Sequence, residues 1–557
     1  MVNSKRTRRP RSGRAFLVAC GMTVAAFAIL FIQRQRSADP TSYVALAAEP
    51  VHGKRKSNGP RMSGNPFPHA TGNARAGRTV FRFETFGNEG FWTDAVRMPQ
   101  GMKAKKLTPV QALQAGLHVD IERINPTMRR AMAKELKTDL SPLHAPLLND
   151  PKTTVKLVNA NAVIGIVARD TNGDRKLDIE HGDKVGIACA ICHTITDESV
   201  YAIPGKGSIG RRVDGPATHS INMGALLAMA DNSRALYPNL QLELGGKTAG
   251  RAPKGLTEKS TEAEVDAYLM NPRFYPVGTF DDTPDGNGNP VQNVPVFRTD
   301  LAAPWGSAGE HSRLENIGNA SYTTNLDLTN LVTPEGRKFM KLKGGAAGVE
   351  LVNDYEQILK ETGVKGYPFV KSRLIGKVGA PSSPVGRRVD SRKLLDLNAY
   401  FDSLQAPRGA KVSAVSARRG REVFRAECTS CHNVDQSKHV PPMLVPMKTI
   451  FPGYKPAVMA RRQAPMSPIQ NSPGTFDDKM IVVDASDRGA IRGNAMPLLL
   501  DLARKPKFLH DASVPSLDAL LNPTRGAKAP HPFYVHDARR RADVVTFLRG
   551  LEIKQRR

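Results

Sequence analysis

Cys189-Ala190-Ile191-Cys192-His193 and Cys428-Thr429-Ser430-Cys431-His432 are the two most informative stretches of this chain. Each has the pattern Cys-x-x-Cys-His, in which two cysteine sulfurs attach a haem porphyrin and the adjacent histidine reaches the iron. The spacing is fixed because two thioethers and one imidazole must meet the same rigid ring. We therefore expect two covalently bound haem c groups. The expected attachment residues are Cys189, Cys192, Cys428 and Cys431, and the expected proximal iron ligands are His193 and His432.

Two other interpretations of a Cys-x-x-Cys pair are a thioredoxin-like redox pair and half of a zinc site. A structural zinc site needs four ligands. The chain has five cysteines, and the fifth, Cys20, lies in an N-terminal apolar run. The rest of the chain therefore has no thiol left for a structural disulfide or for completing a cysteine-rich zinc site.

The N-terminus is first basic and then apolar. Residues 15–32 read AFLVACGMTVAAFAILFI and follow six lysines and arginines. This pattern predicts an uncleaved signal anchor within residues 1–36 that crosses a bacterial inner membrane, with the main body in the periplasm. The alternative is cleavage at Ala45-Leu46-Ala47, which would leave a soluble periplasmic or secreted protein. The composition of residues 37–75, rich in Pro, Gly and Ser, predicts a flexible tether.

The chain is strongly basic, with 80 lysines and arginines against 52 acidic residues and a net charge of +28. Such a charge favours an anionic partner or surface. We do not expect nucleic acid, because a haem protein outside the cytoplasm rarely meets it. Anionic lipid headgroups or an acidic electron-transfer protein fit better, and the alternative is a solvated basic surface without a specific partner.

Helical periodicity and the haem motifs together predict two domains, at residues 76–405 and 412–553. Each is expected to close with an amphipathic helix. The apolar face would consist of Leu394, Leu397, Phe401 and Leu404 in the first domain, and of Val544, Phe547, Leu548 and Leu551 in the second. Thr261 and Glu264 predict a capping box at the start of another helix. The expected fold class is mainly α, with tandem cytochrome c-like domains, extensive loops and one preceding transmembrane helix.

The two motifs and the C-terminal tail resemble the bacterial di-haem cytochrome c peroxidase and MauG superfamily. The tail segments FLHDASVPSLDALLNP at 508–523 and HPFYVHDARRRADVVTFLRGL at 531–551 are most similar to its rubber-oxygenase-like branch, although Ala512 stands where a glycine is usual. The resemblance covers roughly residues 180–553. It implies a peroxidase-like oxidoreductase with one six-coordinate relay haem and one haem with an open or displaceable site for peroxide or dioxygen. A small electron-transfer protein would be its partner. The alternative is a non-catalytic electron-transfer cytochrome in which both haems are six-coordinate.

The resemblance also suggests distal ligands. His531 matches a histidine that precedes the closing helix in the rubber-oxygenase-like branch, so it is the expected distal ligand of the second haem. Met496 is the alternative ligand, and a third interpretation leaves His531 packed at the surface. His219 is either a sixth ligand of the first haem or an ordinary loop histidine. The haem at His193 is the expected catalytic one. Trp305 is either a relay between the haems or a core residue.

A calcium site is predicted at Asp170, Asn172, Asp174 and Asp178. These side chains supply oxygens at positions 1, 3, 5 and 9 of a calcium-binding loop. The loop departs from the usual pattern because Arg175 replaces a glycine and His181 replaces the last glutamate. The superfamily often holds calcium near its haems, whereas the residues alone also fit an Asn-Gly turn with solvated acids. A second acidic turn, at 281–289, matches less well.

Overall fold

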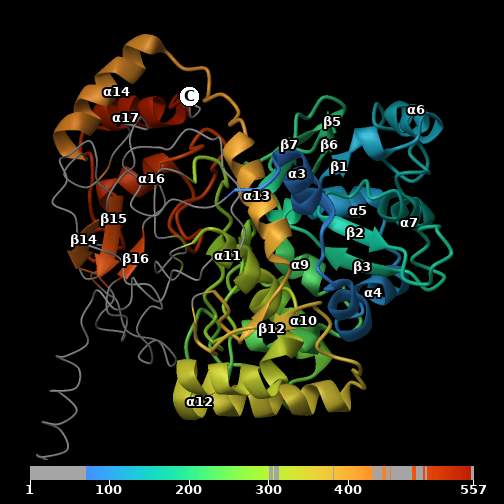
Figure 1. The fold of residues 1–557 in the computed structure, drawn as a ribbon. Coiled ribbons are helices and arrows are strands. Elements are labelled where there is room, and N and C mark those ends of the chain that lie inside the picture. Colours follow the sequence, from blue (N-terminus) through green and yellow to red (C-terminus); the bar gives the residue numbers. More distant parts are fainter. Residues whose placement is uncertain are drawn as a thin grey trace, which may run out of the picture. The chain divides into compact units, whose positions relative to one another are not determined.

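Two helix pairs, one in each predicted domain, organise the fold (Figure 1). In the first pair α3 (Ala74–Phe83) packs against α13 (Ser391–Ser403), and in the second α14 (Ala414–Glu427) packs against α17 (Ala538–Arg549). The computed structural model describes residues 71–299, 305, 311, 313–380, 382–428, 432, 442–446, 452, 480–484, 493–495 and 499–553.

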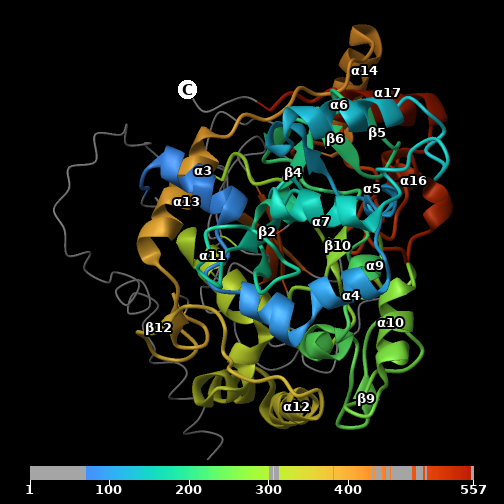
Figure 2. The same cartoon turned by 90° about the vertical axis from the view of Figure 1, so that its right-hand side faces the viewer.

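The first helix pair joins segments that are far apart in the sequence (Figure 2). Helix α3 begins where the Asn73 side chain accepts a hydrogen bond from the Ala76 N–H, at 2.9 Å. It buries Val80 and Phe81. Helix α13 begins at the capping side chain of Asp390. The predicted apolar face of α13 is confirmed, with Leu394 and Leu397 buried and Phe401 and Leu404 half-buried against the same cluster.

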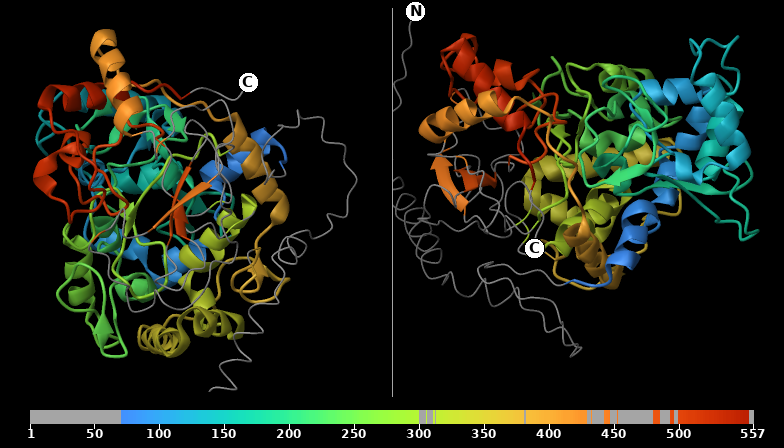
Figure 3. Two further views of the ribbon diagram at one scale, coloured as in Figure 1. Left: turned by 90° about the vertical axis from the view of Figure 1, so that its left-hand side faces the viewer. Right: turned by 90° about the horizontal axis from the view of Figure 1, so that it is seen from above.

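The second helix pair repeats the first. Helix α14 buries Val423 and Phe424, and α17 buries Val544, Phe547 and Leu548, as its periodicity predicts. The Leu551 side chain is half-buried against the same cluster. A short helix, α16 (Leu517–Leu521), contacts α17. Figure 3 shows this orange and red helix pair from two further sides.

A glycine lies at the contact point of each helix pair. A Cβ atom on Gly77 would lie 1.9 Å from the carbonyl oxygen of Asp396, and one on Gly420 would lie 1.9 Å from that of Asp543. The helices can approach this closely only because neither position carries a side chain. The surrounding sequences are also alike, Gly-Arg-Thr-Val-Phe-Arg at 77–82 and Gly-Arg-Glu-Val-Phe-Arg at 420–425. Sequence and packing therefore both describe a tandem repeat.

The two repeats differ in what lies between their helices. Residues 84–188 separate α3 from the first haem motif, whereas Cys428 follows α14 directly. This first insertion contains α4 (Met98–Ala104), α5 (Pro109–Gln114), α6 (Pro126–Glu135) and α7 (Pro151–Asn159). The region after the motif contains α9 (Met223–Leu227), α10 (Glu262–Met270), α11 (Glu315–Ala320) and α12 (Pro334–Glu361), which is kinked at Gly345. The capping box predicted at Thr261 and Glu264 is confirmed at the start of α10.

The strands are short and form sheets of two or three strands. The three-stranded sheets have the orders β1 (Val119–Asp120), β6 (Ser208–Gly210), β5 (Tyr201–Ala202) and β14 (Pro442–Pro446), β15 (Met480–Asp484), β16 (Gly493–Ala495). The antiparallel pairs are β2 (Ile166–Arg169) with β3 (Lys184–Ile187), β4 (Thr194–Thr196) with β7 (Arg212–Asp214), β8 (Glu243–Leu244) with β9 (Lys247–Thr248), β10 (Thr279–Phe280) with β11 (Val291–Gln292), and β12 (Arg373–Leu374) with β13 (Arg387–Arg388). Short 3-10 and π segments lie at Phe91–Ala95, Ile121–Arg123, Ser233–Asn239, Ser321–Asn325, Leu328–Val332 and Pro523–Arg525.

The predicted fold class was wrong and needs correction. Helix accounts for 42% of the structure and strand for 10%, so helices are accompanied by many small sheets and long loops. In the part of the chain that the structure describes, no helix has the length and apolar character needed to cross a membrane. The predicted transmembrane helix is therefore not supported. Residues 15–32, where it was placed, and the tether before residue 71 lie outside the described residues.

Candidate haem-attachment sites

The first motif lies on a single helical turn between two strands. Strand β3 leads into Cys189, which precedes α8 (Ala190–His193), and β4 follows at once. The Nδ1 atom of His193 lies 2.8 Å from the carbonyl oxygen of Val294. A carbonyl can only accept, so Nδ1 carries the proton and the lone pair is on Nε2, the nitrogen left for a metal. Burial lowers the pKa of His193 to about 4, which keeps the ring neutral at pH 7.

The two thiols of this motif are poorly suited to thiolate chemistry. Burial raises the pKa of Cys192 to about 12, and burial also raises that of Cys189. A reactive redox cysteine or a zinc-binding cysteine needs a thiolate, which electropositive surroundings stabilise. These surroundings instead keep both thiols protonated when no metal is bound.

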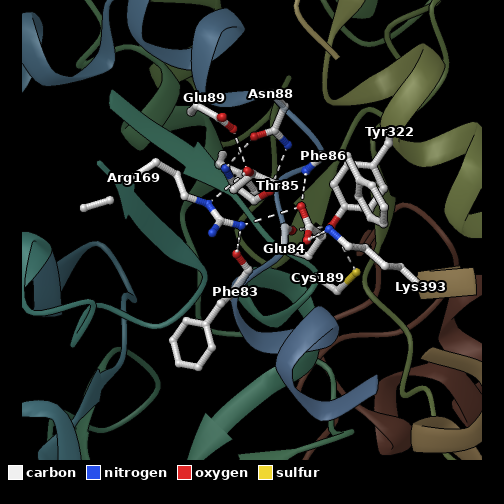
Figure 4. A network of polar contacts seen from close by, with 12 residues as sticks. Phe83, Glu84, Thr85, Phe86, Asn88, Glu89, Arg169, Cys189, Tyr322 and Lys393 are labelled. Atoms are coloured by element: carbon white, nitrogen blue, oxygen red, sulfur yellow. Dashed lines mark hydrogen bonds and ion pairs between the residues drawn. The ribbon is translucent and has the colours of Figure 1, made fainter. Parts of the chain in front are cut away.

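Tyr322 connects Cys189 to the turn after α3. Its hydroxyl donates to the carbonyl oxygen of Glu84 at 2.9 Å and lies 3.5 Å from the Cys189 sulfur. Its ring is fully buried and meets the Phe86 ring edge-on, with the two centroids 4.5 Å apart. Figure 4 shows Tyr322 between Phe86 and Cys189. Sequence analysis did not single out this tyrosine, because its partners come from two distant segments.

A buried carboxylate fixes the strand after His193. Asp214 on β7 accepts from the Thr194 hydroxyl at 2.9 Å and from Arg82 Nε at 2.6 Å. The Tyr400 hydroxyl of α13 also donates to it. Arg82 belongs to α3 and Tyr400 to α13. The Asp214 side chain therefore links both helices of the first pair to the strand that follows the haem motif.

The second motif begins at the end of α14, where Cys428 is the C-cap residue. Residues 429–431, which include Cys431, lie outside the described residues, as does Met496. The backbone N–H of His432 donates to the carbonyl oxygen of Cys428 at 2.9 Å. The ring of His432 lies beside that of Phe424, with the centroids 6.4 Å apart. Helix α14 therefore ends at Cys428 and places the Phe424 ring next to the motif.

The imidazole of His432 lies opposite a second imidazole, that of His531. The two rings have centroids 6.1 Å apart and planes inclined by 43°. Two imidazoles that ligate one metal from opposite sides, at about 2 Å each, place their centroids roughly 6 Å apart. The observed separation therefore fits an iron held between these two histidines.

Two further features of His531 agree with a ligand role. Its Nδ1 atom is buried and has no hydrogen-bond partner within the described part of the chain. Its backbone has a φ of 56°, a left-handed conformation that is uncommon for a residue with a side chain. Such strained residues cluster at functional sites. Burial, followed by the nearby His432, lowers the pKa of His531 to about 4, so the ring is neutral at pH 7.

A short segment of the first domain contacts the second. The Gln292 backbone N–H donates to the carbonyl oxygen of His510 at 2.6 Å, and its side-chain amide donates to that of Leu509. Lys505 donates to the Gln292 side-chain oxygen at 3.0 Å. Beside this contact, Arg251 forms an ion pair with Asp511. Residues 508–511 (FLHD) thus contact β11, the strand that leads to Val294. The sequence of the tail alone could not predict this contact.

His219 and Trp305 are the two other candidate residues of the first domain. The Thr218 N–H donates to the carbonyl oxygen of Cys192 at 2.9 Å, so His219 lies next to the backbone of the first motif. Burial, followed by the charge of Lys505, lowers the pKa of His219 to about 3. Among the described residues, the His219 ring does not face the His193 ring in the way that the His531 ring faces that of His432. Trp305 is buried with Leu314 in a small apolar cluster, which is the core position considered as its alternative.

The predicted calcium loop is held by its own backbone. Asp170 accepts from the N–H groups of Gly173 and Arg175, at 2.7 and 2.9 Å. Asp174 accepts from Lys176, and Asp178 pairs with the His181 ring. Over the described residues, no group of three or more His, Cys, Asp or Glu side chains is arranged to hold a metal ion. Calcium binding at Asn172 and its neighbours stays a prediction.

Comparison of the chain with protein-family models, with characterised proteins and with solved structures finds no match. The functional argument therefore depends on the residues and contacts described above.

Proposed function

We propose that this protein is a di-haem c-type cytochrome with peroxidase-like oxidoreductase activity. The observation that carries the proposal is the pairing of His432 and His531, whose ring separation suits one iron, in a chain whose other motif histidine, His193, has no such partner among the described residues. An iron with two strong protein ligands passes electrons, whereas one with a single histidine can also bind peroxide or dioxygen.

The residues around the second motif suit a relay role. His432 and His531 would hold the iron from both faces, and Cys428 and Cys431 would form the thioethers. Phe424 packs beside His432, and Phe547 packs against Phe424 with the ring centroids 5.5 Å apart. This apolar packing would exclude water from the ligand side and favour electron transfer over substrate binding.

The residues around the first motif suit a reactive haem. Cys189 and Cys192 would attach it, and His193 would present Nε2 to the iron while Val294 fixes the ring through Nδ1. This hydrogen bond orients the imidazole and increases its basicity, as outer-shell acceptors do for metal-bound histidines. His219 stays the alternative sixth ligand of this haem.

The setting of this reaction is also part of the proposal. Haem c is attached outside the bacterial cytoplasm, so the body of the protein would act in the periplasm. Its electrons would pass to or from a small electron-transfer protein. The net charge of +28 favours an acidic partner.

Optical spectroscopy of the purified full-length protein tests this function. We expect one low-spin haem and one haem with a high-spin ferric band, and we expect peroxide, cyanide and carbon monoxide to perturb the second of these alone. If both haems are low-spin and ignore all three ligands, the protein is an electron carrier and the enzyme proposal is wrong. If denatured protein from a cell that matures haem c shows no haem stain on a gel, both interpretations fail.

A further inference from the structure

Three large aliphatic side chains are exposed close together in the first domain. Leu342 on α12 is 52% exposed, and Leu374 and Ile375, at the end of β12 and directly after it, are 58% and 50% exposed. Figures 1 and 2 both show β12 next to α12. Single exposed leucines are ordinary at a protein surface, whereas a group of them indicates a surface that contacts something apolar.

Two glycines of the β12–β13 hairpin bring these side chains together. A Cβ atom on Gly379 would lie 2.7 Å from the Cδ2 atom of Leu342. A Cβ atom on Gly386 would lie 3.4 Å from the Cδ1 atom of Leu374 and 3.3 Å from the Cγ2 atom of Val378. Val378 directly precedes Gly379, so Leu342 and Leu374 belong to one continuous apolar surface.

The sequence around this surface is basic. Residues 336–349 contain four lysines and arginines and residues 362–389 contain six, and neither range has an aspartate or a glutamate. Two of these arginines pair with glutamates. Four other cations are exposed and form no ion pair within the described part of the chain, namely Lys338, Lys341, Arg373 and Lys377. We call these four, with Leu342, Leu374 and Ile375, the basic apolar patch.

The arrangement of the patch suits the boundary between lipid headgroups and acyl chains. Lys338, Lys341 and Leu342 share one face of α12, because residues three and four apart are neighbours on a helix. Like charges at this spacing repel, and an anionic surface would relieve the repulsion. Aliphatic side chains can enter the acyl region while long lysine side chains reach the phosphates.

A protein partner fits these residues less well. The centres of protein–protein interfaces are enriched in aromatic residues and depleted in lysine. The basic apolar patch has no aromatic member, and three of its four cations are lysines. A membrane that contains anionic lipids attracts each lysine or arginine near its surface. Charge and apolar exposure together therefore favour a lipid surface.

We propose that the basic apolar patch docks this protein on an anionic phospholipid bilayer. Leu342, Leu374 and Ile375 would enter the outer part of the acyl region, and the four cations would contact lipid phosphates. The proposal goes beyond the proposed function and needs no haem at either motif. It is built only on described residues of the first domain.

A nitroxide spin label at residue 375 of the full-length protein tests the proposal. The label is attached to Ile375→Cys in a Cys20→Ser background, and that background alone measures labelling of other thiols. Electron paramagnetic resonance reports the mobility of the label and its accessibility to oxygen, which is enriched among acyl chains. We expect the label to become slower and more accessible to oxygen with vesicles that contain phosphatidylglycerol, but not with pure phosphatidylcholine vesicles. Vesicle binding by another part of the chain would not produce this signal.

Neutralisation of two lysines measures the electrostatic contribution. Lys341→Gln combined with Lys377→Gln should lower the docking equilibrium constant about 25-fold, since each cation near an anionic membrane contributes about fivefold. The control combines Lys134→Gln and Lys137→Gln, two exposed lysines on and directly after α6. This pair makes the same change of net charge outside the patch and should leave the constant unchanged.

Removal of an aliphatic side chain measures the apolar contribution. Leu374→Ala should lower the docking constant about tenfold, because less apolar surface leaves water on docking. Leu143→Ala is the control, since Leu143 is 82% exposed and lies outside the patch. All substituted side chains are exposed, and circular dichroism checks that each variant is folded.

The proposal is overturned if the label has the same mobility and oxygen accessibility with phosphatidylglycerol vesicles as in buffer, or if the two lysine pairs have equal effects. Slowing of the label by soluble polyglutamate but not by vesicles would assign the patch to an acidic protein. Slowing that increases with protein concentration in the absence of vesicles would assign it to a second copy of this chain. Either result would also overturn the proposal. None of them bears on the proposed function, which a haem stain tests separately.

Discussion

The Nδ1 atom of His193 donates a hydrogen bond of 2.8 Å to the carbonyl oxygen of Val294. Val294 follows closely after Gln292, and the Gln292 N–H donates to the carbonyl oxygen of His510 in the second domain. One short segment therefore orients the imidazole of His193, the proposed proximal ligand of the first haem, and contacts the other domain. A change in this contact with His510 would therefore reach the ring of His193 through the segment from Gln292 to Val294.

Replacement of Gln292 by alanine tests this link. The variant loses the acceptor of Lys505 and the donor to Leu509, but it keeps the backbone contact with His510. Burial already lowers the pKa of Lys505 to about 8, and the variant would leave its ammonium without this acceptor. We expect electron transfer between the haems to slow about tenfold, the lower range of outer-shell effects. Flash-induced reduction of one haem, followed at the wavelength of the other, measures this rate.

The control for that experiment is Gln357→Ala, which removes an exposed glutamine whose side chain contacts Glu361. It should leave the transfer rate unchanged. Equal rates in the wild type and in Gln292→Ala would show that this segment does not couple the domains.

Replacement of His531 by alanine should convert the second haem from a six-coordinate low-spin state to a high-spin state. The reason is that the imidazole facing His432 at 6.1 Å is lost, and water is a weaker ligand. Electron paramagnetic resonance of the ferric protein distinguishes these states. His536→Ala removes an exposed histidine of the same segment and should leave the low-spin signal intact. A low-spin signal that persists in His531→Ala would assign the distal position to another residue.

Sequence reasoning succeeded where the information is local. The apolar faces of α13 and α17 and the capping box at Thr261 follow from spacing within one helix, and all three are present. His531 was singled out through the resemblance, by its place before the closing helix. The structure places its ring 6.1 Å from that of His432, and its role as an iron ligand stays a prediction.

The features that the sequence did not predict depend on contacts between distant segments. Asn88 donates to the carbonyl oxygen of Ile187 at 2.8 Å, which holds the first insertion against the strand before the haem motif. Tyr322 reaches Glu84 across 238 residues. No periodicity of one segment reveals such pairs. The repeated Gly-Arg-x-Val-Phe-Arg pattern at 77–82 and 420–425 was the signal that could have placed the first helix of each domain.

Substitution of alanine at either helix contact should destabilise the domain concerned. A Cβ at Gly77 or Gly420 would lie 1.9 Å from a carbonyl oxygen of the partner helix, so the helices must move apart. Overpacking of this kind costs about 1–3 kcal/mol. We expect Gly77→Ala and Gly420→Ala to lower the free energy of unfolding by that amount in chemical denaturation followed by circular dichroism. Thr79→Ala changes an exposed position of α3 and should be neutral, whereas equal stability of the glycine variants would contradict the close approach.

Stability should also depend on pH through His118, a buried residue of the first domain. Its Nδ1 accepts from the Ser208 N–H at 3.2 Å and from the Ser208 hydroxyl at 2.7 Å, and its Nε2 lies 3.1 Å from the Ser220 hydroxyl. A second proton would have to lie on Nδ1, which is already accepting, and burial lowers the pKa from 6.5 to about 4. The unfolded chain therefore binds the proton more readily, so stability is complete above the unfolded pKa and is lost as the pH falls toward 4.

This shift predicts a loss of about 2 kcal/mol between pH 7 and pH 5 from His118 alone. His118→Gln keeps an acceptor and a donor but cannot titrate, so its free energy of unfolding should fall less over that interval than the wild-type value does. Urea denaturation at the two pH values measures the difference. His536→Gln, at an exposed histidine, should follow the wild-type dependence. If His118→Gln followed it as well, the protonation of His118 would have no part in the acid sensitivity of the fold.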